Sequence, residues 1–404
     1  MQSLIRRNRN YRLLFTAGVM TNLGDGVVAL ALPWLATMLT RDPLAIAAVA
    51  AAGRLPWLVF ALPAGVIVDR ADRRRLIARA DLMRAGLVLA ILGLALGAPG
   101  PGAVWALVGL AFLLGSAEVL RDNAAQTILP ALVDPADLEA ANGQMWSAEQ
   151  LTGQFIGPPL AGVLIGLGIA LPFGLDAAAL VLAAGLVWLI ALPREARAPQ
   201  RFGPALAEGI AYMRADRPLL RLAVVLGLVN FLAMGTMTVQ VLFAQDVLGL
   251  TAAAYGLVLS VAAAGAIAGS LLAPLLIRGI GAQRCLYLAL AVWAASYGVI
   301  GLTGSGPVMA ASLFVFMAGS MLWNVITVSW RQRRIPGPVL GRVNSIYRFF
   351  GWGSMPLGAL AAGALVAALE PGWGREVALR APFMVAGVLS LGLFFYGVAR
   401  LRLD

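Results

Sequence analysis

Residues 65–75 read Gly65-Val66-Ile67-Val68-Asp69-Arg70-Ala71-Asp72-Arg73-Arg74-Arg75, a dense run of charge between two long apolar stretches. So many charges cannot lie in lipid, because each one costs about 2.5–3.5 kcal/mol at the centre of a membrane helix. Short loops rich in arginine stay on the cytoplasmic side of a bilayer. This run therefore predicts a membrane protein with a short, charged cytoplasmic loop.

The composition agrees with a bilayer as the solvent. The chain has 404 residues, of which 61% are hydrophobic and 12% are charged, whereas soluble domains have roughly 45–50% apolar and about 25% charged residues. The net charge is +11, and all 30 basic residues are arginine, since the sequence contains no lysine. These arginines lie in short gaps between apolar runs and not on one polar domain, so we reject nucleic-acid binding.

The residues that support most enzyme chemistry are scarce. Cys285 is the single cysteine and histidine is absent, which excludes an intrachain disulfide and a Cys/His zinc site. We find neither a metal-ligand cluster nor a phosphate-binding loop in the sequence. We therefore expect no cofactor, and we give a membrane-embedded enzyme little weight.

Apolar runs long enough to span a bilayer, about 20 residues, occur about twelve times. Turn residues such as Asp42-Pro43 and Gly304-Ser305-Gly306-Pro307 separate them. The sequence predicts spans near residues 12–39, 44–68, 76–97, 103–127, 140–166, 170–192, 219–246, 252–277, 284–303, 307–330, 341–368 and 379–399.

The arginines are distributed unequally between the two sets of loops, and this predicts the orientation. The loops on one side of the membrane carry most of the arginines, and the loops on the other side hold little beyond Arg41, Arg375 and Arg380. Since basic loops stay inside, we expect both termini in the cytoplasm. The basic set comprises Arg6, Arg7, Arg9, Arg12, the 70–75 cluster, Arg194, Arg197, Arg201, Arg214, Arg217, Arg221, Arg278, Arg284, Arg331, Arg333, Arg334, Arg342, Arg400 and Arg402.

The longest polar gap, 193–218, divides the chain into a six-helix half at 1–192 and another at 219–404. We interpret the gap as a cytoplasmic linker. Two halves of this kind, each built from three-helix inverted repeats, are a recurring plan of secondary transporters.

Charged residues inside spans usually face a cavity or a partner. Asp25 lies about 13 residues into span one and Arg54 about 10 residues into the antiparallel span two, so at 1.5 Å per residue their depths agree within about one turn. Asp25 is then either a proton-coupling carboxylate modulated by Arg54 or half of a fixed structural ion pair.

Glu149 lies in span five, where Asn142, Trp146 and Gly153 share its helical face. It is either a cavity-facing proton or cation site or a partner in an interhelical hydrogen bond.

Further charges lie at the level of the 69–75 loop, in the cytoplasmic halves of spans three and four. We expect them to form a network with Arg70 and Arg73 that latches the cytoplasmic side. The alternative is a solvated loop that sets only the topology. The residues are Asp81, Arg84, Glu118, Arg121 and Asp122.

Aromatic, thioether and amide side chains in span interiors are candidates for a substrate cavity, because pockets for apolar ligands are lined by such groups. Tryptophans near span ends are alternatively interfacial anchors. The candidates are Trp57, Trp146, Asn230, Met234, Gln240, Asn324, Tyr347 and Arg348.

The charged loop resembles a known family motif. Gly65-x-x-x-Asp69-Arg70-x-x-Arg73-Arg74 is similar to the loop between spans two and three of the major facilitator superfamily, with Asp72 where that motif usually has glycine. Gly153-x-x-x-Gly157-Pro158-x-x-Ala161-Gly162 resembles the antiporter motif of that superfamily, with Ala161 in place of a usual glycine. The resemblance implies that Asp69 faces the start of span eleven, at Gly341-Arg342.

Shorter stretches resemble one branch, drug:proton antiporter family 3, which includes macrolide and multidrug efflux pumps and the enterobactin exporter. They are Asn22-Leu23-Gly24-Asp25-Gly26, Leu129-Pro130-Ala131-Leu132-Val133-Asp134, Ala141-Asn142-Gly143, Gly157-Pro158-Pro159, Glu208-Gly209, Gly341-Arg342-Val343-Asn344 and Pro356-Leu357-Gly358.

Together the residues and the resemblance imply an all-α, multi-pass exporter in a bacterial inner membrane. It would exchange amphiphilic or lipophilic small molecules for protons and work as a monomer among anionic lipid headgroups. The alternatives are a siderophore, lipid or metabolite exporter, an uncoupled facilitator, and a non-transporting receptor or scaffold.

Overall fold

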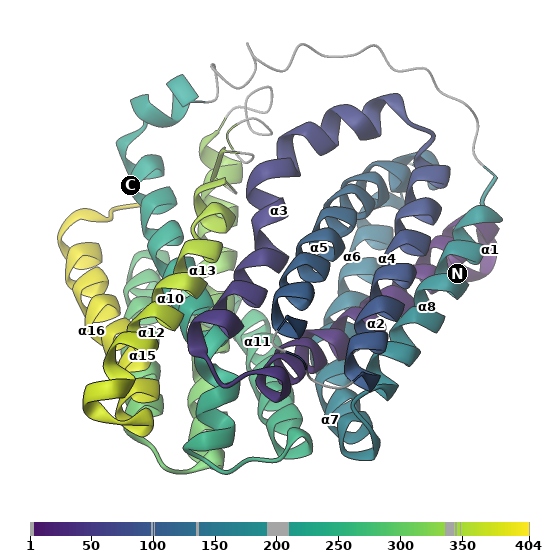
Figure 1. Cartoon of the computed structure of the whole chain (residues 1–404). Coiled ribbons are helices and arrows are strands. Elements are labelled where there is room, and N and C mark those ends of the chain that lie inside the picture. The colour runs from purple at the N-terminus through teal and green to yellow at the C-terminus, as the bar shows by residue number, and fades with distance from the viewer. Residues whose placement is uncertain are drawn as a thin grey trace. The chain divides into compact units, whose positions relative to one another are not determined.

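The structure is a computed structural model that describes residues 4–97, 100, 102–134, 137–191, 210–335, 343, 346–347 and 349–403. Its regular elements in this part of the chain are all helices (Figure 1). The predicted linker at 193–218 lies mostly outside the described residues.

The chain forms two compact units. The first comprises Met1–Arg41, Ala52–Pro199 and Thr251–Leu257, and the second comprises Asp42–Ala51, Gln200–Leu250 and Val258–Asp404.

The helices of the first part of the chain begin with a single turn, Leu4–Arg7. They are α1 (Leu4–Arg7), α2 (Arg9–Leu39), α3 (Pro43–Arg70), α4 (Arg73–Leu96), α5 (Ala103–Ile128), the 3₁₀ turn η1 (Leu129–Ala131), α6 (Leu138–Glu149), the π-helix η3 (Gln150–Ile156), α7 (Gly157–Leu167) and α8 (Leu171–Trp188).

The second part of the chain continues with long helices joined by short connections. They are α10 (Arg217–Asp246), α11 (Ala252–Ile280), α12 (Ala282–Leu302), α13 (Gly306–Arg334), α15 (Met355–Trp373) and α16 (Arg375–Arg400).

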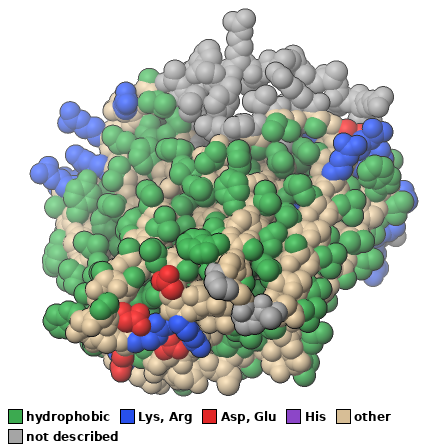
Figure 2. All heavy atoms as spheres, in the orientation of Figure 1, with side chains coloured by type: hydrophobic (Ala, Val, Ile, Leu, Met, Phe, Trp, Pro, Cys, Tyr) green, Lys and Arg blue, Asp and Glu red, His purple; other side chains and the backbone are tan. Residues whose placement is uncertain are grey.

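Ten helical segments in the described part are long and apolar enough to cross a membrane. Two further predicted spans, 76–97 and 140–166, correspond to α4 and to the series α6–η3–α7. The first is rich in charge and the second is broken into three pieces, which explains why neither forms an uninterrupted apolar helix. Hydrophobic side chains spread over the face shown in Figure 2, as expected of helices whose outer surface meets lipid.

The charged stretch at 65–75 forms less of a loop than the sequence suggests, because α3 ends at Arg70 and α4 begins at Arg73. Asp72 is the N-cap of α4, where its side chain accepts a hydrogen bond from the Arg75 backbone N–H at 3.1 Å. A capping carboxylate satisfies one of the free N–H groups at a helix start. Asp72 therefore has a structural function at the position where the family motif usually has glycine.

In the first unit, α2 packs against α8 and the α6–η3–α7 series, and α4 packs against α5 and α8. In the second unit, α12 packs against α13 and α16, and α10 packs against α15 and α16. An aromatic core lies in the second unit, where Trp293 and Trp323 have ring centroids 5.4 Å apart. These packings set which helix faces are closed, and hence where polar side chains can meet.

Candidate functional site

Two other helix segments, η3 and α8, closely approach the middle of α2. A Cβ placed on Gly26 would lie 2.1 Å from the backbone oxygen of Gly153 in η3, and one on Gly24 would lie 2.0 Å from Oδ1 of Asp176 in α8. Real Cβ atoms do not come so near to other atoms, so residue 26, which meets backbone, requires glycine, whereas a side chain at residue 24 would displace the Asp176 carboxyl group. Asp25, between them, is thus held at a helix crossing.

Asp25 forms an ion pair with Arg84 of α4. The Arg84 side chain is 3% exposed, whereas that of Asp25 is 39% exposed. Arg54 was the partner expected from the depth argument, but the structure differs: Arg54 is exposed and interacts electrostatically with Glu118 of α5. Equal depth in two helices does not fix the direction in which their side chains point, and here α4 supplies the guanidinium.

Asp81 and Arg121 extend this ion pair into a cluster. Asp81 is fully buried, and its Oδ1 lies 3.8 Å from Nη1 of Arg84 and 3.5 Å from Nε of Arg121. Arg121 also donates from Nη2 to the Thr21 hydroxyl at 2.7 Å and from Nη1 to Asp122 at 3.2 Å. Residues from α2, α4 and α5 therefore meet in one polar centre.

Asp176 belongs to the same centre, although it is not among the site residues predicted from the sequence. It is 1% exposed and interacts electrostatically with Asp25, Arg84 and Asp81. The sequence does indicate it, because Asp176 is the single charged residue in the predicted span 170–192. A lone carboxylate in a membrane span usually has a function. We define the N-terminal charge cluster as Asp25, Asp81, Arg84, Glu118, Arg121, Asp122 and Asp176.

The cluster contains more acid than base. Five of its members are carboxylic acids and two are arginines, with Arg54 as a third basic group beside Glu118. Within the described residues at least two carboxyl groups therefore lack a positive partner of their own. Uncompensated charge inside a helical membrane bundle is strongly disfavoured, so the cluster has the composition of a site that takes up protons.

Glu149 lies at the end of α6 and is exposed, as are Asn142 and Trp146 on the same face. It interacts electrostatically with Asp122, Arg121 and Asp25, so the structure places it towards the N-terminal charge cluster. Gly153, expected on this exposed face, is instead buried against α2, where the backbone oxygen of Asn22 lies 3.2 Å from its Cβ position.

The predicted antiporter motif begins in a π-helix. Residues Gln150–Ile156 follow the π pattern, and the Gly157 N–H donates to the Thr152 oxygen, five residues back. Pro158 and Pro159 lie in the first turn of α7, where the missing N–H of proline is tolerated, and the π turn lies directly before them. Such turns are rare and frequently mark functional sites.

The glycines of this motif make close packing possible. A Cβ on Gly157 would lie 2.7 Å from Gly26 Cα, and one on Gly162 would lie 2.6 Å from the backbone oxygen of Ala252. Small residues at these positions let helix backbones approach in lipid.

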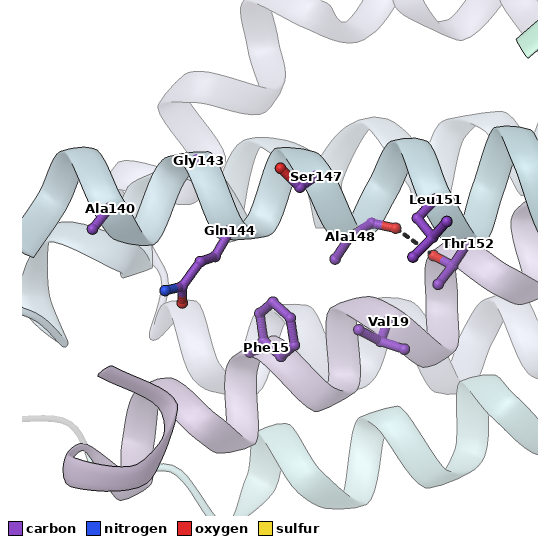
Figure 3. Close-up of a pocket in the computed structure, with 9 residues that line it drawn as sticks. All are labelled: Phe15, Val19, Ala140, Gly143, Gln144, Ser147, Ala148, Leu151 and Thr152. Atoms are coloured by element: carbon purple, nitrogen blue, oxygen red, sulfur yellow. Dashed lines mark hydrogen bonds between the residues drawn. The ribbon is translucent and has the colours of Figure 1, made fainter. Parts of the chain in front are cut away.

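An open groove of about 690 Å³ lies between α2 and α6–η3. Figure 3 shows Phe15 and Val19 of α2 opposite the α6–η3 side chains, with the Thr152 hydroxyl bonded to the Ala148 oxygen. Its size falls within the range of small-molecule pockets, roughly 300–1,000 Å³. Its lining was not anticipated from the sequence: Phe15, Val19, Ala140, Gly143, Gln144, Ser147, Ala148, Leu151 and Thr152.

The substrate-cavity candidates of the second unit have mixed surroundings. Asn324 is exposed, and Asn230 donates to the Gly351 oxygen at 2.9 Å. Met234, Gln240 and Tyr347 are 8%, 5% and 3% exposed, and the Tyr347 ring lies 3.7 Å from the Arg331 guanidinium carbon. These three side chains are closed to solvent in this structure.

The remaining candidates divide between described and undescribed positions. Trp57 is partly buried, and Trp146 is half exposed. Arg73 starts α4 and is partly buried. Gly65, Asp69 and Arg70 belong to the last two turns of α3, but their surroundings lie outside the description, as do Gly341, Arg342 and Arg348.

Comparison with known proteins gives a consistent family. The model for transmembrane secretion effectors of the major facilitator superfamily matches residues 5–393. Macrolide efflux protein A of Enterococcus faecalis is 25% identical over 76% of this chain and 96% of its own. The multidrug efflux pump Tap of Mycolicibacterium fortuitum is 33% identical over 38% of each chain.

Solved structures agree on the fold. A point mutant of the nucleoside transporter NupG superposes with a TM-score of 0.80 at 12% identity, covering 98% of this chain and 100% of that one. A bacterial homologue of the iron transporter ferroportin, in its inward-facing state, gives 0.77 at 17% identity, covering 99% and 100%. The chain is therefore a multi-pass membrane transporter with the all-α major facilitator fold, and it belongs to the transmembrane secretion effector family of that superfamily.

Proposed function

We propose that this protein exports amphiphilic or lipophilic small molecules of the antibiotic type across a bacterial cytoplasmic membrane, in exchange for protons, with both termini in the cytoplasm. Support for efflux comes from the family and from relatives that are macrolide and multidrug efflux proteins. The apolar groove between α2 and α6–η3 is suited to an apolar part of such a molecule.

The observation that carries the proton-coupling proposal is the excess of acid in the N-terminal charge cluster. Asp25 is its accessible member, with a side chain 39% exposed, and it is paired with the almost fully buried Arg84. A proton that reaches Asp25 removes the charge that holds Arg84. The Coulombic attraction between the two groups, which solvent screens in part because Asp25 is more than a third exposed, is then lost.

This loss of attraction provides a way to couple protonation to conformation. Arg84, released from Asp25, is attracted to the remaining carboxylates. This changes the relative free energies of the conformational states in which the helices that carry these groups are arranged differently. A ligand or proton shifts a conformational equilibrium only through such a difference between states. We propose that protonation of Asp25 or Glu149 favours the state that releases substrate outside.

The proposed latch and the proposed coupling site share residues. Arg84 and Asp81 were expected in a cytoplasmic latch, yet Arg84 pairs with Asp25. Opening of a latch formed by the loop residues Asp69, Arg70 and Arg73 with Gly341-Arg342 would then be sensitive to the same proton. The monomeric state and the contact with anionic lipid remain part of this proposal.

The test is transport by the purified protein in proteoliposomes with an imposed pH gradient, with erythromycin and ethidium as probes. We expect Asp25→Asn to reduce uphill accumulation by at least about tenfold, equivalent to about 1.4 kcal/mol of lost coupling, and Glu149→Gln to reduce it less. Glu376→Gln, which removes a charge that is 66% exposed on α16, is the matched control.

Three results would each change the conclusion. Uphill transport retained in both Asp25→Asn and Glu149→Gln would refute the coupling assignment. Wild-type exchange of the probes without pH-driven accumulation would indicate an uncoupled facilitator. Absence of flux for both probes would call for a screen of secreted siderophores, lipids and metabolites, and a failure there would favour a receptor or scaffold.

A further inference from the structure

Asp176 is the one charged residue of α8, Leu171–Trp188. It is 1% exposed, and its Oδ1 has no hydrogen-bond partner among the described residues. A carboxylate ion buried without a donor is unstable by several kcal/mol, whereas the neutral acid is tolerated far better. The surroundings of Asp176 therefore suit a carboxyl group that holds a proton.

Asp176 also lies against the part of α2 that carries Asp25. Its Oδ1 would be 2.0 Å and its Cα 3.4 Å from a Cβ on Gly24, so the carboxyl group fills the space that a side chain of residue 24 would need. Gly24 directly precedes Asp25 in the chain, so Asp176 contacts the turn of α2 that carries Asp25.

The charged groups that face Asp176 are few. Asp25 is on α2, and Arg84 and Asp81 are on α4. The third helix that packs against α8 is α7, and its sequence Gly157–Leu167 contains no charged residue. Arg84 is thus the positive group shared by Asp176 and Asp25, and in this structure it is paired with Asp25.

We propose that Asp176 is a second proton-carrying carboxyl group of the transport cycle and that it alternates with Asp25 as the partner of Arg84. This inference rests on the proposed proton coupling and adds a residue and a route to it. Asp25 is the accessible end of the route, and Asp176 is the enclosed end.

The step conserves atoms and charge. With Arg84 on Asp25, the proton resides on a carboxyl oxygen of Asp176. When Arg84 turns to Asp176, the O–H bond of Asp176 breaks and the same proton binds an oxygen of Asp25. One carboxylate, one carboxylic acid and one guanidinium are present before and after. Only the accessible acid then exchanges protons with water.

Infrared spectroscopy of the full-length protein in lipid vesicles tests the protonation directly, because neutral carboxyl groups have a C=O band that carboxylates lack. We expect this band at neutral pH to lose intensity in Asp176→Asn and to persist in Glu376→Gln. Gly24→Ala, which displaces the carboxyl group without removing it, should shift the frequency of the band. An unchanged band in both Asp176→Asn and Gly24→Ala would overturn the proposal.

Transport provides the second readout. Asp176→Asn mimics the neutral acid and cannot release a proton, so we expect pH-driven accumulation of erythromycin to fall by at least about tenfold. Glu376→Gln, on the exposed surface of α16, should keep the wild-type accumulation. Full coupling in Asp176→Asn would also overturn the proposal. If the wild type shows no coupling, the proposed function fails, and the infrared result still decides whether Asp176 holds a proton.

Discussion

Among the single residues of the site, Arg84 links the accessible acid Asp25 to the buried acid Asp81. Its side chain is 3% exposed and lies between Asp25 and Asp81. Removing one partner from a buried ion pair is costly, about 3–5 kcal/mol, because the other charge stays buried and unpaired. The stability of the first unit should therefore depend on Arg84 far more than on exposed arginines of the same helix.

We predict that Arg84→Met destabilises the protein in detergent by about 3 kcal/mol, because the buried Asp81 and the partly exposed Asp25 both lose a counter-charge. Thermal unfolding followed by fluorescence measures the effect. Arg79→Met is the matched control, since Arg79 is an exposed arginine on α4.

A charge-balanced double variant separates charge from packing. If the loss arises from unpaired charge, Asp25→Asn combined with Arg84→Met should recover part of the stability. Equal melting temperatures for Arg84→Met and Arg79→Met would show that Arg84 is not a stabilising counter-ion.

At the scale of elements, α2 is held by backbone-to-backbone contact with η3 and α7. Gly26 meets both Gly153, inside the π turn, and Gly157, directly after it. This crossing fixes the position of Asp25. A change in the angle of the α6–α7 series would therefore move the acid.

We predict that Gly26→Ala destabilises the fold by about 1–3 kcal/mol, the usual cost of overpacking, because its Cβ would lie 2.1 Å from a backbone oxygen. Gly185→Ala on α8, where a Cβ meets nothing within 4 Å, is the control. It should be neutral or slightly stabilising, since alanine favours helix over glycine by about 1 kcal/mol. A Gly26→Ala protein as stable as Gly185→Ala would contradict the tight crossing. The measurement is thermal unfolding in detergent.

At the scale of the whole molecule, the arginine distribution predicts that both termini are cytoplasmic. The connections on the two sides differ in charge: Arg400 and Arg402 flank the end of α16, whereas Thr303–Ser305, between α12 and α13, is uncharged. Arginine-rich loops and helix ends stay on the cytoplasmic side of the membrane, so these two regions should lie on opposite faces of the membrane.

Cysteine labelling tests this orientation in a Cys285→Ala background, because Cys285 is the single cysteine and is buried. We expect an impermeant maleimide added to intact cells to label Gly304→Cys, and to label Arg402→Cys only after the membrane is permeabilised. Both positions are exposed in the structure. Labelling of Arg402→Cys in intact cells would reverse the predicted topology.

Individual residues show which parts of the site can be predicted from the sequence and which cannot. Asp25 was found because a carboxylate inside an apolar run stands out, and its partner was missed because span counting gives depth but not direction. Arg84 lies within hydrogen-bonding reach of Asp25 because α4 turns that face towards α2. Asp176 satisfied the same criterion as Asp25, yet its importance becomes visible only from the contact with Gly24.

The amino-acid sequence is enough to predict that the chain lies in a membrane, that it is helical, and to which family it belongs. These properties follow from apolar length, from the placement of charge and from local motifs, all of which are read along one dimension. The tertiary structure alone decided that five acids and two arginines from four helices form one cluster. Charge pairing depends on which helix faces meet, and that is set by close contacts such as Gly26 with Gly153.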